Sequence, residues 1–280
     1  MNKLRDVLRF FVGWLIPHSA IVVRCHFRDK QAKRDKAEMT RAISQKLRRA
    51  NETLAYQDAV DFLVHQGCDR TQVLEGSIPE TSLDYCAAFL LRNSASYKKP
   101  LLGLHVGNFV GISLAYFVKF SKELHADSLV VSIDPNLTHR GIYNPIQMVT
   151  KLLARYGLQK NAMILTGYSL EKCVSNDGAI ITSDYDPFMR FPDECSCECV
   201  LNALTKLTQT RFDYAVIDGN HTGSYLQREI ELIDSLLNVG GLLILDDIGW
   251  TEIQNVYQQL SANKYKNLGG DGRVGILGKL

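Results

Sequence analysis

The clearest pattern of hydrophobic and polar positions lies in residues 212–248. Two continuous apolar runs, residues 214–217 and 242–245, each stop at an aspartate, and apolar residues recur at helical spacing between them. An unbroken apolar run bounded by polar residues is typical of a strand buried on both faces of a parallel sheet. Gly240 and Gly241 are predicted to end the intervening helix. The stretch therefore predicts a strand–helix–strand crossover, which brings both strand ends to one edge of the sheet.

The chain upstream and downstream shows the same alternation of short apolar runs and helical patterns. Such alternation predicts an α/β fold with a doubly wound, mostly parallel sheet. The segment at the C-terminus also has strand character and is predicted to be a last, antiparallel strand. Further strands are expected at 101–106, 128–133, 162–165 and 271–280, and helices at 53–64, 81–91, 113–122, 143–156 and 199–207.

Charge divides the chain unevenly. Of the 32 basic and 30 acidic residues, residues 1–50 hold 13 and 4, so the remainder carries 19 basic and 26 acidic residues. We expect a basic amphipathic N-terminal extension over 1–50, a helical cap region over 51–99 and a globular core domain over 100–280. The mildly acidic remainder argues against nucleic acid as a partner, because phosphate contacts require a basic surface.

The N-terminal extension begins with apolar residues at helical spacing, separated by lysine and arginine. Pro17 interrupts the apolar positions, and neither half reaches the roughly 20 apolar residues that cross a bilayer. Two interpretations of residues 1–28 stay open: a helix lying in a membrane interface, or a helix packed on the domain or on a second copy of the chain. The first predicts peripheral association with the inner membrane surface, and the second a homo-oligomer.

Cysteine usage and the N-terminus indicate the compartment. The seven cysteines are an odd number without paired spacing, which favours a reduced, intracellular protein. The early apolar run lacks a small-residue cleavage site, so no signal peptide is expected and the predicted location is cytoplasmic. The alternating cysteines of residues 195–199 have poor spacing for structural zinc and are not expected to bind metal.

Polar residues follow the two strands of the crossover directly. Asp218 and His221 come after the first strand, and Asp246 and Asp247 after the second. Carboxylates are hard ligands that suit Mg²⁺ or another hard divalent cation, and a histidine beside such an ion could act as a general base. The alternative is that Asp246 and Asp247 cap the next helix and that His221 is a solvated loop residue.

A second polar site is expected where the strands at 101–106 and 128–133 end. Gly107 and Gly111, with Asn108 between them, form a strand–helix turn that lets a ligand approach the backbone closely. Asp134 ends the neighbouring strand and could accept hydrogen bonds from the ribose hydroxyls of an adenosine-containing ligand. Its alternative role is to cap the following helix.

The motifs IDGNH at 217–221 and GGLLILDD at 240–247 resemble those of class I S-adenosylmethionine-dependent methyltransferases. The similarity is to the metal-dependent small-molecule O-methyltransferases, in the branch with macrolide-sugar O-methyltransferases and cephalosporin-hydroxylase-like proteins. It covers residues 100–280 and implies a seven-stranded Rossmann-like sheet with S-adenosylmethionine as cofactor. It also implies a metal held by Asp218, Asp246 and Asp247 and a catalytic base at His221. The cofactor residues that it implies are Gly107, Asn108, Gly111, Asp134, Ser169 and Asp218.

Three positions depart from the family pattern. His105 stands where the family has an acid before the glycine turn, and Tyr168 stands where an aspartate precedes Ser169. The aromatic residue usual shortly after the catalytic histidine is missing, with Tyr225 a displaced candidate, whereas Glu229 matches an acidic position of the family. These departures put the cofactor contacts, rather than the catalytic cluster, in question.

The function that the sequence predicts is methyl transfer from S-adenosylmethionine to a hydroxyl of a small molecule or sugar, assisted by a divalent metal with His221 as base. Two alternatives stay open. One is a different nucleotide-cofactor enzyme on the same sheet, and the other is a non-catalytic scaffold with the methyltransferase fold. The sequence does not indicate the acceptor.

Overall fold

A computed structural model describes residues 54–94, 99–170, 199–207 and 211–280. The chain divides into two compact units, Met1–Leu47 and Arg48–Leu280, and the described residues all belong to the second. The predicted N-terminal extension and most of the 195–199 cysteine cluster lie outside the described residues. Cys68, Cys86 and Cys199, the cysteines within them, are free and buried. No helix in the described ranges is long and apolar enough to cross a membrane.

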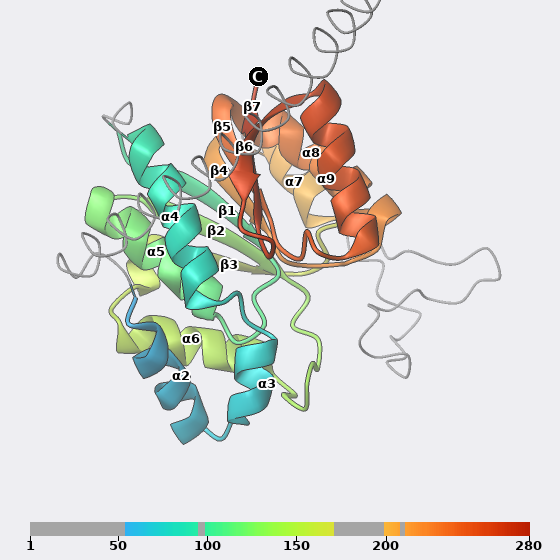
Figure 1. Ribbon diagram of the computed structural model, residues 1–280. Helices are drawn as coiled ribbons and strands as arrows, with labels where there is room; N and C mark the ends of the chain where they lie inside the picture. Colours follow the sequence, from blue (N-terminus) through green and yellow to red (C-terminus); the bar gives the residue numbers. More distant parts are fainter. Residues whose placement is uncertain (1–53, 95–98, 171–198, 208–210) are drawn as a thin grey trace, which may run out of the picture. The chain divides into compact units, whose positions relative to one another are not determined.

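The centre of the second unit is a seven-stranded sheet with the order β3-β2-β1-β4-β5-β7-β6 (Figure 1). The strands from β3 to β5 are parallel, whereas β7 is antiparallel to both of its neighbours. The predicted doubly wound, mostly parallel sheet with a late antiparallel strand is thereby confirmed. The strands are β1 (Leu102–Val106), β2 (Leu129–Asp134), β3 (Ala162–Thr166), β4 (Phe212–Ile217), β5 (Leu237–Leu245), β6 (Tyr265–Gly270) and β7 (Gly275–Lys279).

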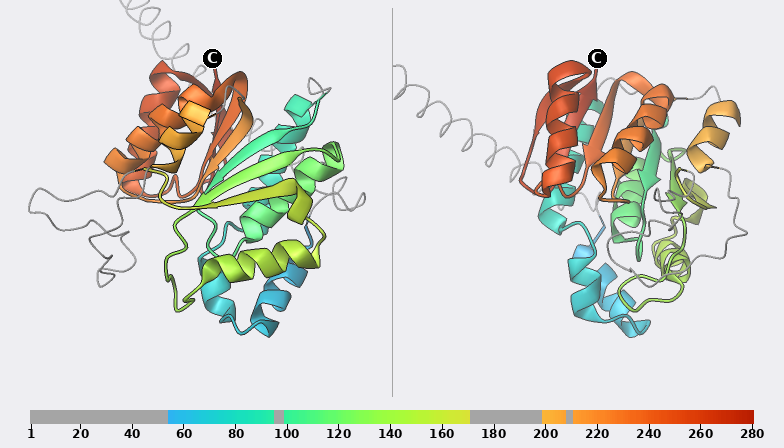
Figure 2. Two further views of the ribbon diagram at one scale, coloured as in Figure 1. Left: turned by 180° about the vertical axis from the view of Figure 1, so that it is seen from behind. Right: turned by 90° about the vertical axis from the view of Figure 1, so that its right-hand side faces the viewer.

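Helices cover both faces of the sheet (Figures 1 and 2). On one face α4 packs against α5, and α2 and α6 pack beside α5; on the other, α8 packs between α7 and α9. The helices are α2 (Tyr56–His65), α3 (Arg70–Glu75), α4 (Glu80–Ser94), α5 (Ile112–Leu124), α6 (Pro145–Arg155), α7 (Val200–Leu207), α8 (Gly223–Leu236) and α9 (Thr251–Asn263), with a 3-10 turn η1 (Gln159–Asn161) before β3.

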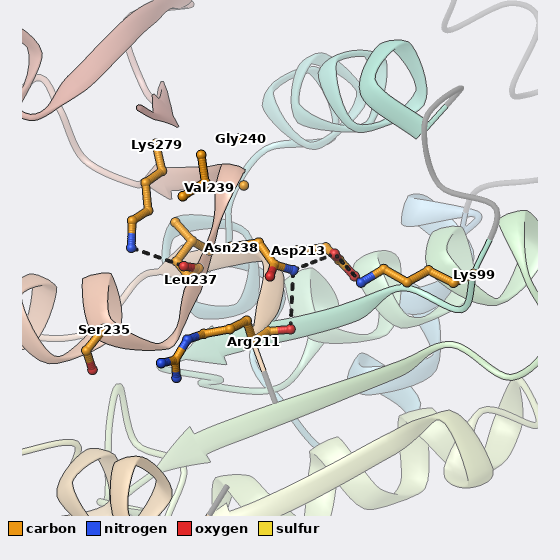
Figure 3. Close-up of a pocket in the computed structure, with 10 residues that line it drawn as sticks. Lys99, Arg211, Asp213, Ser235, Leu237, Asn238, Val239, Gly240 and Lys279 are labelled. Atoms are coloured by element: carbon orange, nitrogen blue, oxygen red, sulfur yellow. Dashed lines mark hydrogen bonds and ion pairs between the residues drawn. The ribbon is translucent and has the colours of Figure 1, made fainter. Parts of the chain in front are cut away.

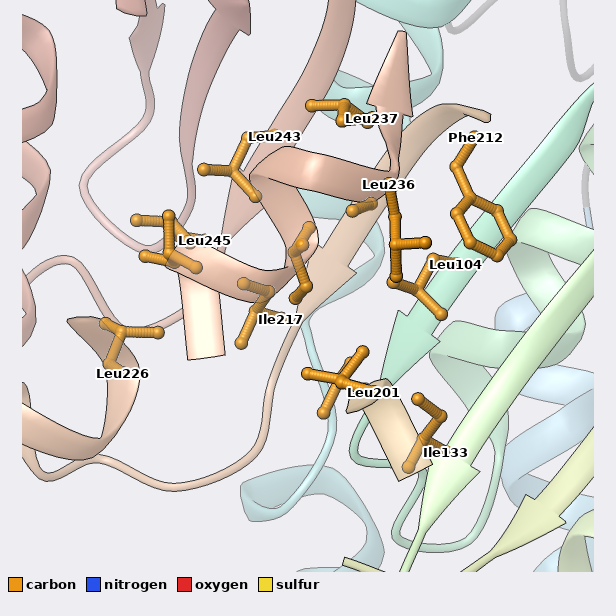
Figure 4. Packing of buried hydrophobic residues seen from close by; sticks show 14 of the residues in the cluster. Leu104, Ile133, Leu201, Phe212, Ile217, Leu226, Leu236, Leu237, Leu243 and Leu245 are labelled. Carbon is orange, nitrogen blue, oxygen red and sulfur yellow. The ribbon is translucent and has the colours of Figure 1, made fainter. Parts of the chain in front are cut away.

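Strand β4 lies in the middle of the sheet, and all six of its residues are buried. Its apolar run is the consequence, since helices cover it on both sides. A large part of the hydrophobic core lies between the strands and α7–α9 (Figure 4). Among the side chains in this core are Leu104, Ile133, Ile217, Leu243 and Leu245 from the strands, Leu226 and Leu236 from α8, and Leu201 from α7.

The boundary between α8 and β5 differs from the prediction that the glycine pair ends the helix. The helix already ends at Leu236, and Leu237 adopts an extended conformation and pairs with Phe212. Leu237 is 2% exposed, so burial beside β4 favours a strand at this position. Gly240 instead lies within β5 at φ 77°, where the register with β4 shifts. The left-handed glycine thus lies in an irregular part of β5, between its pairing with Phe212 and its pairing with Tyr214.

The two central strands fit together through a glycine and a tyrosine on the α5 face. A Cβ atom at Gly103 of β1 would lie 2.3 Å from the ring of Tyr214 on β4, so the ring fills the place of a side chain. The Tyr214 hydroxyl forms a 2.8 Å hydrogen bond with Ser121 of α5. This contact fixes the C-terminal part of α5 over the starts of β1 and β4.

The helices of residues 54–94 belong to the same compact unit as the sheet. In α4, Asp84 accepts a 2.7 Å hydrogen bond from the Tyr116 hydroxyl of α5, and both side chains are buried. At the end of α3, Glu75 forms an ion pair with Arg140 from the loop after β2. The predicted cap region thus contacts a loop at the carboxyl edge of the sheet.

Candidate active site

The carboxyl ends of β1, β4 and β5 meet at one edge of the sheet. Val106 is in register with Ile217, and Ile217 with Leu245. Backbone hydrogen bonds continue past the strands, from the Asp218 N–H to the Val106 carbonyl at 2.8 Å and from the Asp246 N–H to the Ile217 carbonyl at 3.0 Å. The predicted convergence of the strand-end polar residues is therefore a direct result of the register.

The turn after β1 brings backbone from two strands unusually close together. Gly107 has φ 83°, and a Cβ atom there would lie 1.9 Å from the Asp218 carbonyl oxygen. Only glycine fits both the backbone conformation and the space. Gly111, at φ 91°, is the N-cap of α5. The turn therefore packs its backbone directly against the end of β4 and leads at once into a helix, whose start is a place where anionic or polar ligands bind in many proteins.

Asp134, at the end of β2, ties this turn to the next loop. Its carboxylate accepts hydrogen bonds from the Asn108 N–H at 2.7 Å and from the Asn136 N–H at 2.6 Å. Burial raises the pKa of Asp134, and these backbone donors oppose the rise. The alternative role as a helix cap is wrong, because Asn144 is the N-cap of α6. Binding of ribose by Asp134 stays a prediction, as does cofactor contact by Asn108.

Ser169 lies beyond the end of β3, next to the first turn of α8. Its hydroxyl forms a 3.1 Å hydrogen bond with the Tyr225 hydroxyl, which also accepts from the Leu170 N–H at 3.3 Å. Tyr225 therefore fixes the loop after β3, and its role as a displaced family aromatic stays a prediction. Ser169 stands at the same edge as the glycine turn, and its predicted cofactor role remains a prediction.

His105, the departure from the family pattern, lies inside the protein. The residue is fully buried, its ring is 6.1 Å from that of Phe117 on α5, and neither ring nitrogen forms a hydrogen bond. Burial lowers the pKa of His105 from 6.5 to about 4, only partly opposed by polar groups of Gly107 and Asn108. A neutral histidine thus packs under the turn where the family has an acid.

His221 lies between a carboxylate and an aromatic ring. Its Nε2 atom is 2.7 Å from Oδ2 of Asp247, and its ring is 4.9 Å from the Trp250 ring at 31°. Trp250 is the N-cap residue of α9 and is 43% exposed. Sequence reasoning missed it, although it supplies the aromatic neighbour expected nearer to the histidine. Both contacts restrict the orientation of the imidazole.

Asp218, His221 and Asp247 form a group with the geometry of a metal site. One potential ligand atom from each lies within 4.8 Å of the other two. Burial raises the pKa of the Asp218 carboxyl well above its usual range, and the charges of Asp246 and Asp247 raise it further. A void of about 10 Å³ borders Asp218 and His221, which is on the scale of one small ligand or water. Oxygen and nitrogen donors of this kind fit a hard divalent cation.

Asp246 is engaged by a residue that the sequence analysis did not single out. Arg273, from the turn between β6 and β7, donates from Nε to Oδ1 of Asp246 at 2.8 Å and from a terminal nitrogen to Oδ2 at 2.6 Å. Its other terminal nitrogen lies 2.7 Å from Oδ1 of Asp247. Neither aspartate caps α9, so that alternative is wrong. No pattern in the sequence links Arg273 to the acidic pair.

A second hollow lies at the opposite edge of the sheet, where β4 and β5 begin, and has a volume of about 730 Å³ (Figure 3). Asp213 on its wall accepts from the Leu102 N–H and from Asn238, both at 2.9 Å, and lies 3.4 Å from Lys99. Lys279 donates to the Leu237 carbonyl at 3.1 Å. Asp213 and Lys279 thus form hydrogen bonds that connect the beginnings of the strands. The carboxyl edge remains the candidate active site.

Comparisons with known proteins agree with this geometry. A family model described as a methyltransferase domain matches residues 104–248. The chain is similar to the O-methyltransferase from Bacillus cereus in complex with SAH, with 12% identity, a TM-score of 0.54 and coverage of 85% of this chain and 97% of that chain.

Two further solved structures are similar. The O-methyltransferase TomG from Streptomyces achromogenes, involved in tomaymycin synthesis and in complex with SAM, has 12% identity and a TM-score of 0.50, covering 81% of this chain and 90% of its own. A putative O-methyltransferase from Klebsiella pneumoniae has 13% identity and a TM-score of 0.51, covering 88% and 98%. No curated protein sequence matches the chain. Since the family model spans more than half of the sequence, and the fold is that of the class I enzymes, this chain belongs to the methyltransferase-domain family.

Proposed function

We propose that this protein transfers a methyl group from S-adenosylmethionine to a hydroxyl of a small molecule or sugar. One observation carries the proposal: the 2.7 Å pair of His221 and Asp247 stands beside Asp218, whose backbone touches the glycine turn at Gly107. A base and a close-approach cofactor turn at one sheet edge are what group transfer from a bound cofactor to a hydroxyl requires.

The fit of the cofactor is supported by the place of the turn, since Gly107 and Gly111 bring the start of α5 directly beside Asp218 at the carboxyl edge of the sheet. The residues that would hold it are Gly107, Asn108, Gly111, Asp134, Ser169 and Asp218. When bound, S-adenosylmethionine supplies an activated methyl group on a sulfonium. Similar folds have been solved with SAH in the Bacillus cereus protein and SAM in TomG, which supports this choice.

The fit of a divalent metal such as Mg²⁺ is supported by the donor set of Asp218, His221 and Asp247. Asp218 and Asp247 would hold it, and Asp246 would join them when its oxygens are released by Arg273. When bound, the ion would lower the pKa of the acceptor hydroxyl.

His221 is the proposed base. Because a carboxylate only accepts, Nε2 of the neutral ring donates to Asp247, and the basic lone pair lies on Nδ1. Asp247 and Trp250 orient the ring, so that Nδ1 takes the proton from the acceptor hydroxyl. Asp247 also stabilises the imidazolium that forms. A positioned base of this kind contributes roughly 10²–10⁴-fold to a rate.

Calorimetric titration with S-adenosylhomocysteine, with and without Mg²⁺, tests the proposal first. We expect micromolar binding by the wild-type chain and by His221→Ala, because His221 is assigned to the acceptor and not to the cofactor. With an accepted hydroxyl substrate, His221→Ala should then lose about 10²-fold or more in turnover. Absence of binding in both conditions would contradict methyl transfer and favour the scaffold alternative. Unchanged turnover in His221→Ala would refute the role of the base.

A further inference from the structure

The acidic cluster of the candidate active site is paired with a guanidinium group. Asp218, Asp246 and Asp247 lie together at the carboxyl edge of the sheet. Among the described residues, Arg273 forms ion pairs with Asp246 and Asp247, and its guanidinium is always charged. Asp246 and Asp247 have side chains only 1% and 7% exposed. Such desolvated carboxylates favour a nearby cation, which can be a guanidinium group or a metal ion.

The guanidinium group already occupies the oxygens that a metal would use. Two of its nitrogens bind both oxygens of Asp246, and the third lies against Oδ1 of Asp247. The other oxygen of Asp247 bonds to His221. A metal ion on the acidic pair would therefore lie beside a fixed positive charge, which repels it.

The backbone that carries Arg273 is anchored independently of its side chain. The Arg273 N–H donates to Asp271 at 2.9 Å, and its carbonyl accepts from the Ile248 N–H at 3.0 Å. The side chain is 34% exposed, so the guanidinium reaches solvent by changing its rotamers while the turn stays in place. Release of the acidic pair hence requires no rearrangement of the sheet.

We propose that Arg273 is an internal counter-ion that competes with the divalent metal for Asp246 and Asp247. Without metal it holds the two carboxylates together, and when metal loads it turns outward to solvent. This inference rests on the metal-assisted function proposed above and assigns Arg273 the control of cation loading at that site. Arg273 is a positioning residue, since it acts through the two aspartates.

The test is the binding of Mn²⁺ to the full chain, followed by electron paramagnetic resonance and without turnover. Arg273→Gln removes the competing charge and keeps an amide for hydrogen bonding, so we expect it to bind Mn²⁺ about tenfold or more tightly than wild type. Arg273→Lys keeps the charge and should stay near wild type. Arg228→Gln, which removes an exposed arginine from α8, controls for the change in net charge.

Equal or weaker Mn²⁺ binding by folded Arg273→Gln would overturn the inference, because a purely organising arginine gives that result. The same holds if Arg228→Gln tightens binding as much. The wild-type protein provides a measurement that does not depend on a variant: the Arg273 Nε–H resonance should shift or exchange faster as Mg²⁺ is added. A resonance that does not change while calorimetry records Mg²⁺ binding overturns it.

Titration with S-adenosylhomocysteine on the same samples separates this inference from the proposed function. If the cofactor product binds but neither wild type nor Arg273→Gln binds Mn²⁺, competition at Arg273 is refuted and methyl transfer stands without a metal. If Mn²⁺ binds with the expected order but the cofactor product does not, the cation control stands and methyl transfer fails.

Discussion

Glu229 allows a quantitative test of the buried polar groups near the site. It lies on α8 and is 0% exposed, and neither carboxylate oxygen forms a hydrogen bond. Burial raises its pKa from 4.5 to about 7, with only a partly opposing effect of the Ser169 hydroxyl. We therefore expect Glu229→Gln, which has nearly the same shape and no ionisable group, to change how stability depends on pH.

The sign follows from comparing the folded and unfolded states. Between pH 4.5 and 7 the unfolded chain has lost the Glu229 proton while the folded chain retains it, so stability falls as pH rises through this window. At about 1.4 kcal/mol for each pH unit, the full loss is about 3 kcal/mol, and it is complete above pH 7. The glutamine variant lacks this loss, so its stability relative to wild type should increase by roughly 2–3 kcal/mol from pH 5 to pH 8.

Urea unfolding followed by circular dichroism at several pH values measures this difference. Glu231→Gln is the matched control, because Glu231 lies exposed on the same helix and the substitution is chemically the same. A stability difference between Glu229→Gln and wild type that does not change between pH 5 and pH 8 would refute a raised pKa of the buried Glu229 carboxyl.

Three other substitutions test separate parts of the structure. The free energy of unfolding of His105→Gln should increase by about 3 kcal/mol relative to wild type as pH falls from 7 to 4, because the folded pKa of His105, about 4, lies below that of the unfolded chain. If the stability of both proteins falls equally with pH, the buried neutral histidine is refuted. Gly107→Ala should abolish calorimetric binding of S-adenosylhomocysteine or prevent folding, since its Cβ would lie 1.9 Å from the Asp218 carbonyl oxygen. Gly219→Ala, whose Cβ would have its nearest contact at 3.6 Å, should bind normally, and equal damage in both would argue against the close approach. Trp250→Ala should lower turnover roughly tenfold at unchanged cofactor affinity by releasing the His221 ring, and equal turnover would remove Trp250 from the site.

The parts of the fold that local pattern determines could be predicted from the sequence. Strand β4 and the apolar part of β5 were evident because both are buried runs that stop at an aspartate. The start of β5 was not, since Leu237 becomes a strand through its pairing with Phe212 rather than through its own neighbours in sequence. Strand β6 was missed for a similar reason: its residues, largely exposed or partly exposed, are ordered by pairing with β7.

The candidate site divides in the same manner. The meeting of Asp218, His221 and Asp247 follows from strand order and register, which the crossover pattern predicts. Arg273 and Trp250 contact the site from turns and helix starts outside the strand ends. The hydrophobic pattern of the sequence does not predict which residues such side chains contact. Sequence reasoning therefore placed the carboxylates but not the groups that neutralise and orient them.

The strand order also has a consequence for how the chain folds during synthesis. Strand β7 is the latest of the seven in the chain, yet it lies between β5 and β6. Until it has left the ribosome, the buried residues of β5 present an open edge that invites pairing with other chains. Arg273 arrives with the same hairpin, so Asp246 and Asp247 acquire their counter-ion only when that edge closes. The nascent chain should therefore expose both the β5 side and the unpaired Asp246 and Asp247 at its carboxyl end until the last strand is added.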